Sequence, residues 1–304
     1  MKAVPSDMYY HEADRKALAA LKAIPGLGLI MKKYMEIFSE TTSECLNMAM
    51  KIRLGPNQLP EIYNLLPPIC ETLGIAEPQF YLEMNPYPQA YTDGDSKTFV
   101  TITSGLLDMM TQEELSAVIA HECGHIACHH VLYRSLGFAI LSAGSSFLGG
   151  LGHLITLPLK LAFASWIRCS ELSADRAAAV YMKGSEHVEN VMLRLSSGKK
   201  DLLKNINKEL YMKQAEAYQN MLNDKWNKAM QYFATMWFSH PLSSVRTSEI
   251  NKWCKSDEFS KIIKFMEDES TDVAIVKANT AFCPKCGTAV GNDDKFCKIC
   301  GTAL

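Results

Sequence analysis

The stretch TQEELSAVIAHECGHIACHHVLY, residues 111–133, decides the fold, because it joins the apolar spacing of an amphipathic helix to the metal-binding order H-E-x-x-H. Thr111 is followed three residues later by Glu114, the spacing of a capping box, and the apolar residues come directly afterwards. The sequence therefore predicts a helix that begins at Thr111 and carries the motif near its middle.

Two histidines and a glutamate on this helix have the spacing of a zinc protease site. His121 and His125 lie four residues apart, so on a helix their imidazoles leave the same face and can bind one metal ion. Glu122 lies beside them, where a carboxylate can take a proton from the attacking water without binding the metal itself. A helix with two unrelated histidines fits the same motif, so the interpretation depends on a third ligand.

The segment SELSADR, residues 170–176, supplies candidates for that third ligand and its support. Glu171 and Asp175 are also four residues apart and share a helix face, so Glu171 can complete a site of two histidines and one glutamate. Asp175, one turn further on, can accept a hydrogen bond from the outer ring nitrogen of His121 and fix its tautomer. An ordinary solvated helix face is the alternative for such a pair considered alone.

At these motifs the sequence resembles the HtpX-like gluzincin zinc metallopeptidases, a family that includes the heat-shock protease HtpX and the CAAX prenyl endopeptidase. The resemblance covers residues 60–251 and rests on TSGLLDMMTQEELSAVIAHECGHIACHH, SELSADRAA and SHPLSSVR, in the family's order. It implies a zincin fold and peptide-bond hydrolysis. It also implies that His240 and Arg246 approach the zinc site, where a hydrogen-bond donor or cation would stabilise the oxyanion of the tetrahedral intermediate.

Three short runs rich in aromatic and β-branched residues predict a small sheet at residues 79–84, 89–94 and 98–103. In zincins an edge strand before the metal helix pairs with the extended substrate, and Gln89, Ala90 and Tyr91 occupy that place. The family usually has asparagine where Gln89 stands, but backbone pairing does not depend on that side chain. A purely structural strand is the alternative interpretation.

Helices are predicted at residues 12–52 and 59–73, before the sheet. Residues 136–159, LGFAILSAGSSFLGGLGHLITLPL, carry no charge unless the histidine ionises, and are long enough to cross a bilayer. Their glycines and Pro158 argue against one continuous helix, and a single crossing would separate His125 from Glu171. We therefore favour a cover over the active site, with membrane association through a shallow hairpin as the alternative.

The C-terminal residues 282–304 contain two near-identical C-x-x-C-G knuckles, which predict a zinc ribbon with the ligands Cys283, Cys286, Cys297 and Cys300. So short a segment buries too little apolar surface to fold alone, so the metal would supply its folding free energy. The predicted organisation is a peptidase domain at 1–265, a linker at 266–281 and the ribbon. Protein docking is the expected role of the ribbon.

Composition and charge bear on the class of protein, its partners and its localisation. The 304 residues are 48% hydrophobic and 21% charged, as in ordinary globular proteins, and the net charge of -2 gives no reason to expect nucleic acid as a partner. The first residues lack a signal-peptide pattern, which predicts a cytoplasmic protein, with membrane contact if 136–159 meets lipid. The six cysteines outside the ribbon lack ligand spacing and are expected to pack as small hydrophobes.

The sequence thus predicts an α+β, mainly helical zincin fold with a small edge sheet and a C-terminal zinc ribbon. The predicted function is a zinc endopeptidase with one catalytic and one structural Zn²⁺, acting on misfolded or membrane-associated proteins, with Glu122 as general base. Two alternatives stay open. One is a non-catalytic or latent chaperone or docking protein with the same fold; the other places the function in the ribbon.

Overall fold

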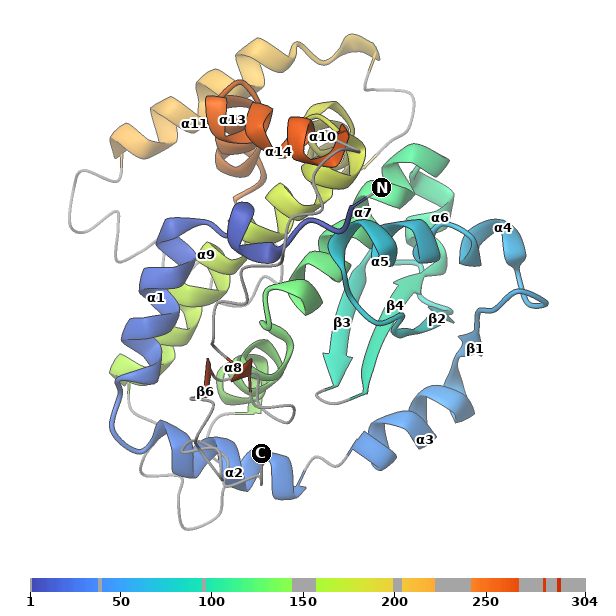
Figure 1. Ribbon diagram of the computed structural model, residues 1–304, viewed down its shortest axis with the longest axis vertical. Helices are drawn as coiled ribbons and strands as arrows, with labels where there is room; N and C mark the ends of the chain where they lie inside the picture. Colours follow the sequence, from blue (N-terminus) through green and yellow to red (C-terminus); the bar gives the residue numbers. More distant parts are fainter. Residues whose placement is uncertain are drawn as a thin grey trace.

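The computed structural model describes residues 2–37, 40–94, 97–143, 157–198, 204–221, 242–267, 281–282 and 289–290. Within these residues helices predominate, and one small sheet stands beside the helix that carries the H-E-x-x-H motif (Figure 1). This architecture confirms the predicted mainly helical α+β class.

The residues before the predicted sheet form several short helices and one two-residue strand. The predicted helical region 12–52 is divided into α1 (Glu12–Lys22), α2 (Leu27–Ile37) and α3 (Glu40–Met50), after a 3-10 turn at Ser6–Met8, and it ends in the strand β1 (Ile52–Arg53). The predicted helix 59–73 consists of α4 (Pro60–Tyr63) and α5 (Leu66–Leu73). Gly74 ends α5 in the left-handed conformation, with φ of 66°.

The three predicted strands are present as β2 (Gln79–Glu83), β3 (Ala90–Gly94) and β4 (Thr98–Thr103). The strand order is β1-β2-β4-β3, with β2 parallel and β3 antiparallel to β4. Because β3 is last in this order, no described strand pairs with its outer edge. The sheet therefore presents β3 beside α7, as Figure 1 shows.

The helix predicted from residue 111 is α7 (Gln112–Ala127), which follows α6 (Ser104–Met109). Its capping box is complete: the Thr111 side chain accepts from the backbone N–H of Glu114, and the Glu114 carboxylate accepts from that of Thr111. Arg194 contacts the same carboxylate in a buried ion pair. The capping box and the ion pair with Arg194 together fix the start of α7 against the rest of the fold.

Two further helices complete the centre, α8 (Val131–Ala143) and the long α9 (Leu157–Met182), which carries Glu171. The C-terminal part adds α10 (Glu186–Ser197), α11 (Lys208–Met221), α13 (Ser243–Cys254) and α14 (Asp257–Glu267). Beyond them, β5 (Ala281–Phe282) pairs antiparallel with β6 (Ala289–Val290). The helices α10, α11, α13 and α14 gather at one end of the molecule in Figure 1.

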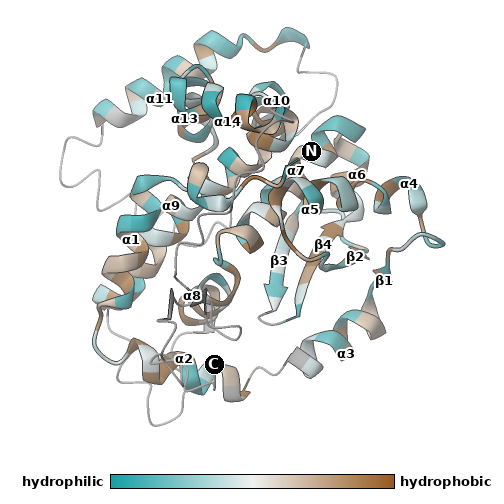
Figure 2. Cartoon of the chain, viewed as in Figure 1, coloured by the Kyte–Doolittle hydropathy of each residue, from teal (hydrophilic) through white to brown (hydrophobic). Residues whose placement is uncertain are grey.

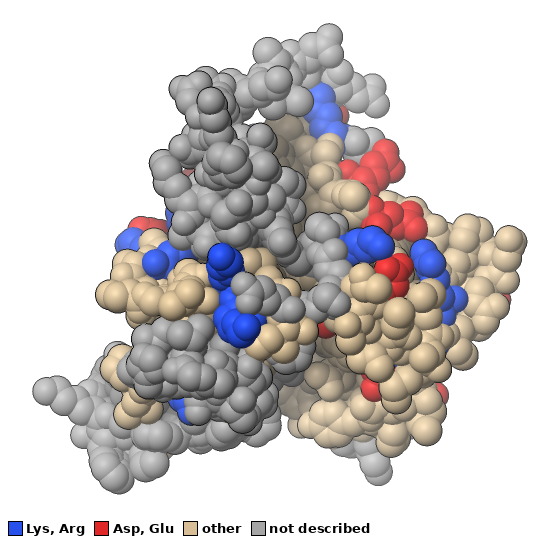
Figure 3. Space-filling view, turned by 90° about the horizontal axis from the view of Figure 1, so that it is seen from below, with Lys and Arg blue, Asp and Glu red and all other residues tan. Residues whose placement is uncertain are grey.

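The buried side chains form two clusters. One joins α5, α7, the inner face of the sheet and the C-terminal helices, and the other joins α1, α2, α8 and α9 around the fully buried Trp166. Figure 2 shows hydrophobic residues along α8 and a more hydrophilic α11. On the face drawn in Figure 3, the described lysines and arginines lie in small groups, some of them beside acidic residues.

Only the two ends of the apolar stretch 136–159 fall within the described residues, in α8 and at the start of α9, and residues 144–156 lie outside them. Among the described helices, none has the length and apolar character needed to cross a membrane. The cover and hairpin interpretations of this stretch both stay predictions.

Helix α7 crosses α9 closely at Gly124. A Cβ atom placed on Gly124 would lie 2.6 Å from Cβ of Ala177 and 3.1 Å from Cα of Ala174. Such distances are too short for any larger residue unless a backbone moves. Since Gly124 immediately precedes His125, this contact brings the motif against the helix that carries Glu171.

We expect Gly124→Ala to lower the free energy of unfolding by about 2 kcal/mol, because overpacking against backbone outweighs the roughly 1 kcal/mol that alanine gains in a helix. Urea unfolding followed by circular dichroism measures the change. Gly184→Ala, between α9 and α10, controls for the added methyl group, because a Cβ there meets no atom within 4 Å. Equal stability of the two variants would show that the crossing tolerates a larger residue.

Candidate metal centre

Three side chains from α7 and α9 converge in the interior. One ligand atom each of His121, His125 and Glu171 lies within 4.8 Å of the others. The Nε2 atoms of His121 and His125 are each 3.4 Å from a different oxygen of the Glu171 carboxylate. Nε2 of His125 is buried and has no hydrogen-bond partner among the described residues. Two imidazoles and a carboxylate facing one point are the donor set of a catalytic zinc site, so these residues fit that ion.

Asp175 lies where the helix spacing places it, one turn beyond Glu171. Its Oδ1 is 2.9 Å from Nδ1 of His121, so the ring nitrogen on the far side of His121 from Glu171 has a carboxylate partner. Asp175 also accepts hydrogen bonds from Nε of Arg246 at 2.7 Å and from Nη2 at 2.5 Å. The hydrogen bond to Asp175 leaves Nε2 as the nitrogen of His121 that faces the metal position.

Two guanidinium groups hold the Glu171 carboxylate. Nη1 of Arg134 lies 2.5 Å from Oε1, and Nη1 of Arg246 lies 3.0 Å from Oε2. The resemblance implied that Arg246 approaches the zinc site. Its guanidinium lies between Glu171 and Asp175, because a buried cation is most stable beside carboxylates that neutralise it. Arg134, at the start of α8, was not anticipated at all.

Glu122 is held from the edge of the sheet. Its side chain is almost entirely buried, and Oγ1 of Thr92 in β3 donates a hydrogen bond to its Oε2 at 2.7 Å. Sequence analysis missed Thr92, although its position one residue beyond Tyr91 on the predicted edge strand was a signal. The strand and the motif are thus joined at the carboxylate proposed to transfer the proton.

The environment gives the two histidines opposite pKa shifts. Burial tends to lower the pKa of His121, but its hydrogen bonds to Asp175 and Glu171 raise it to about 9. Burial, together with the charge of Arg134, holds the pKa of His125 well below its ordinary value. Although burial tends to raise the pKa of Asp175, the Arg246 guanidinium lowers it. A zinc ion at this point would replace the proton of His121, because zinc binds the deprotonated nitrogen.

The three residues expected to pair with substrate lie at the start of β3. Ala90 opens the strand, and the backbone oxygen of Gln89 accepts from the N–H of Thr103, so the inner edge is used by β4. The hydroxyl of Tyr91 donates to Glu83 in β2 and accepts from Lys51, which directly follows α3. Its side chain therefore contacts other parts of the fold. No described strand pairs with the outer backbone edge of β3, so the substrate role of these residues stays a prediction.

Several predicted site residues lie outside the described part of the chain. His240 is one of them, and the ribbon cysteines Cys283, Cys286, Cys297 and Cys300 are the others. In sequence, β5 comes directly before Cys283, and β6 begins three residues after Cys286. The roles of these residues therefore stay predictions.

Two further residues missed by sequence analysis stand behind His125. Nδ1 of His130 lies 3.0 Å from Nδ1 of His125, and Nε2 of His130 lies 2.9 Å from Oδ2 of Asp14 in α1. The available signal for His130 was its place five residues after His125, just beyond the helix end; nothing local pointed to Asp14.

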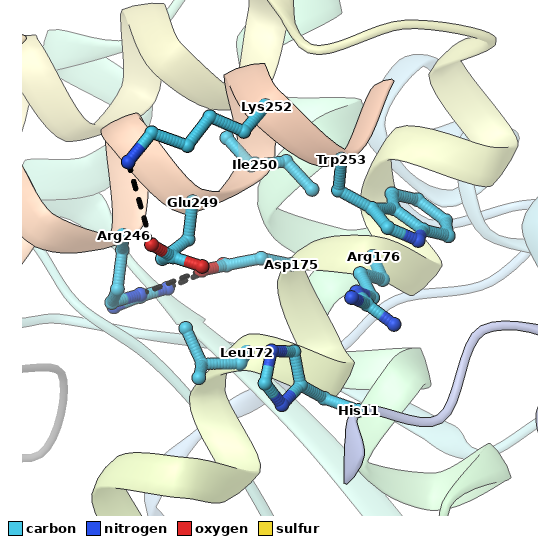
Figure 4. Close-up of a pocket in the computed structure, with 9 residues that line it drawn as sticks. All are labelled: His11, Leu172, Asp175, Arg176, Arg246, Glu249, Ile250, Lys252 and Trp253. Carbon is cyan, nitrogen blue, oxygen red and sulfur yellow. Dashed lines mark hydrogen bonds and ion pairs between the residues drawn. The ribbon is translucent and has the colours of Figure 1, made fainter. Parts of the chain in front are cut away.

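A cavity of about 240 Å³ lies on the far side of Asp175 and Arg246 (Figure 4). It is formed by α9, α13 and the residue before α1, and its walls comprise His11, Leu172, Asp175, Arg176, Arg246, Glu249, Ile250, Lys252 and Trp253. In Figure 4 the Asp175 and Arg246 side chains point toward each other across one side of this space. None of the three candidate ligands belongs to its lining.

Residues 57–254 match the model of peptidase family M48, and this match contains both halves of the candidate metal centre. The chain belongs to peptidase family M48. It is therefore a metalloprotease, and the expected resemblance to HtpX-like enzymes is confirmed. Residues 282–304 match the model of a zinc-ribbon domain, which confirms the C-terminal ribbon. M48 peptidases use zinc, as the candidate ligands suggest.

Curated relatives support the M48 assignment. The chain is 30% identical to the plastoglobule-localized metallopeptidase 48, chloroplastic, of Arabidopsis thaliana, over 89% of this chain and 79% of that protein. It is 32% identical to a protease HtpX homolog of Tropheryma whipplei, over 35% of this chain and 36% of the relative. The protease HtpX homolog 2 of Methanosarcina acetivorans is 24% identical, over 47% of this chain and 57% of that relative. No solved structure matches the chain.

We expect Asp175→Asn to weaken zinc binding at the M48 centre by about 10- to 100-fold, because the amide no longer supplies the charge that orients His121. Competition with a chromogenic zinc chelator measures the dissociation constant, and circular dichroism checks that the variant is folded. Asp108→Asn, an exposed carboxylate in α6, serves as the control. A zinc affinity unchanged by Asp175→Asn would remove Asp175 from the support of the site.

Proposed function

We propose that the chain is a zinc endopeptidase whose catalytic ion is bound by His121, His125 and Glu171, with Glu122 as general base. The observation that carries this proposal is the convergence of the three ligand atoms within 4.8 Å, with Glu122 next to His121 on the same helix. Three protein ligands leave a coordination position for water or substrate, which distinguishes a catalytic from a structural zinc site.

When bound, zinc would polarise the scissile carbonyl and lower the pKa of the attacking water. Glu122 takes the proton from this water and passes it to the leaving amine, so hydrolysis needs no covalent intermediate. The hydrogen bond from Thr92 fixes the direction of the Glu122 carboxylate during both transfers. His240 is the residue proposed from the family resemblance to stabilise the oxyanion.

Arg134 and Arg246 act on the ligand Glu171 rather than on the substrate. Each donates to one of its oxygens, and both arginine side chains are buried. A buried carboxylate with two guanidinium partners keeps its charge and its orientation, as a metal ligand must. Nε and Nη2 of Arg246 donate to Asp175, so this arginine also links the ligand to the support of His121.

The outer edge of β3 supports a substrate of extended polypeptide. Pairing with a strand edge uses the backbone groups of the substrate, which every sequence supplies, and requires a segment that is not folded. We therefore propose unfolded or misfolded proteins as substrates, with Gln89, Ala90 and Tyr91 contributing backbone contacts. The ribbon is proposed to hold a second, structural zinc through its four cysteines and to contact a protein partner.

A closed resting form is a second candidate, favoured by the burial of the centre. Glu122 is 2% exposed and His121 is 7% exposed, so a polypeptide needs a rearrangement to reach them. A latent enzyme, or a docking protein with the same fold, fits this observation. The intact Glu122 favours the enzyme, because a pure binding protein has no use for a base beside zinc.

We expect Glu122→Gln to reduce cleavage of unfolded casein by about 10²- to 10⁴-fold, because the amide cannot accept the proton, while the zinc content stays unchanged. Product peptides are counted by mass spectrometry and zinc by atomic absorption. Glu113→Gln, an exposed glutamate of the same helix, should retain wild-type activity.

The outcomes separate the two candidate functions. Cleavage by the zinc-loaded wild type but not by zinc-loaded Glu122→Gln supports the endopeptidase. If the zinc-loaded wild type leaves casein and a short unstructured peptide intact, the resting protein is latent or non-catalytic. Cleavage by Glu122→Gln at the wild-type rate would remove Glu122 from the mechanism.

A further inference from the structure

We propose that Asp14 and His130 form a positioning pair that fixes the tautomer and direction of His125. The pair would act on zinc affinity from behind the ligand, without touching the substrate. This inference rests on the proposed zinc site and assigns to the N-terminal helix α1 a part in it.

The three groups form a continuous line of hydrogen bonds. Nδ1 of His125 and Nδ1 of His130 are 3.0 Å apart, and Nε2 of His130 is 2.9 Å from Oδ2 of Asp14. The hydroxyl of Tyr10 is 3.3 Å from the same Nε2, so the carboxylate is the nearer partner. His130 and Asp14 are both 0% exposed, so water does not compete for these contacts.

The line permits one arrangement of protons. If Nε2 of His125 faces the metal, its neutral ring carries the proton on Nδ1, and Nδ1 of His130 must accept it. His130 then carries its own proton on Nε2 and donates to Asp14. The opposite tautomer of His130 would set two N–H groups against each other at 3.0 Å. Asp14 therefore determines the tautomer of His130, and His130 determines that of His125.

The backbone after α7 is shaped to deliver His130 to this place. The N–H of His130 donates to the oxygen of His125, and the N–H of His129 donates to that of Ile126, which is a Schellman motif. The motif needs a left-handed residue, and His129 takes that conformation with φ of 56°, where glycine is usual. The turn brings the His130 ring back beneath His125.

The hydrogen-bond partners of Asp14 stabilise it as a buried anion. Besides His130, it accepts hydrogen bonds from Oγ of Ser173 at 2.6 Å and from Nε1 of Trp166 at 2.9 Å. A buried carboxylate keeps its charge only with such partners. Asp14 comes from α1, before residue 57, where the match to the M48 model begins. The direct partner of His121, Asp175, lies within that match, so the two ligands are supported from different parts of the chain.

The test is a double-mutant cycle on zinc affinity in the full chain, measured by chelator competition. His130→Phe keeps an aromatic ring but cannot accept from His125, and we expect zinc affinity to fall by about 10- to 100-fold. Asp14→Asn should lower it by about tenfold in the wild type and have no further effect once His130 is replaced. His130→Gln, whose amide oxygen can accept, should recover part of the affinity.

Controls separate this role from a structural one. Leu21→Val alters a buried residue of the same helix α1 that makes none of these hydrogen bonds, and it should lower stability but leave zinc affinity within about twofold. His125→Ala gives the ribbon's share of bound zinc, which is subtracted. Wild-type affinity in His130→Phe, or an equal loss from Asp14→Asn in both backgrounds, would overturn the proposal. If wild type and His125→Ala bind equal zinc, the proposed catalytic site itself fails.

Discussion

The close crossing of α7 and α9 is the constraint on which the metal centre depends. Gly124 meets Ala177 and Ala174 at distances that admit no side chain, so the two helix backbones approach as near as their atoms allow. Only at this separation does one carboxylate, Glu171, lie 3.4 Å from both imidazoles. The small residues of the crossing are thus as necessary for the site as its ligands, although they take no part in the chemistry.

Charge balance explains why so many ionisable groups are stable in the interior. Two guanidiniums, of Arg134 and Arg246, pair with the carboxylates of Glu171 and Asp175. Glu122 accepts a hydrogen bond from Thr92, and a zinc ion held by Glu171 and the two histidines would add positive charge beside it. Burying an uncompensated charge costs several kcal/mol, so zinc binding and the stability of this core are linked.

The sequence predicted those parts of the molecule whose signals are local. The capping box, the H-E-x-x-H spacing and the alternating strands each depend on neighbours within a few residues. The two-residue strand β1 was missed because it is too short to show periodicity. Thr92, Arg134 and Asp14 were missed because their partners are distant in the chain, and polar residues of these types usually lie at the surface. For Arg246, the resemblance predicted a position near the centre. It did not predict the ion-pair partners, because these are the carboxylates that folding brings nearest to the guanidinium.

The two histidine ligands differ in how their support is assembled, and this difference has a thermodynamic consequence. His121 is supported by Asp175 on α9, the helix that also supplies Glu171, so this half of the site forms when α7 meets α9. His125 is supported through His130 by α1, which must dock separately. If α1 docking strengthens zinc binding, zinc binding must strengthen α1 docking by the same factor. The N-terminal helix and the ion therefore stabilise each other across the buried His125–His130–Asp14 line.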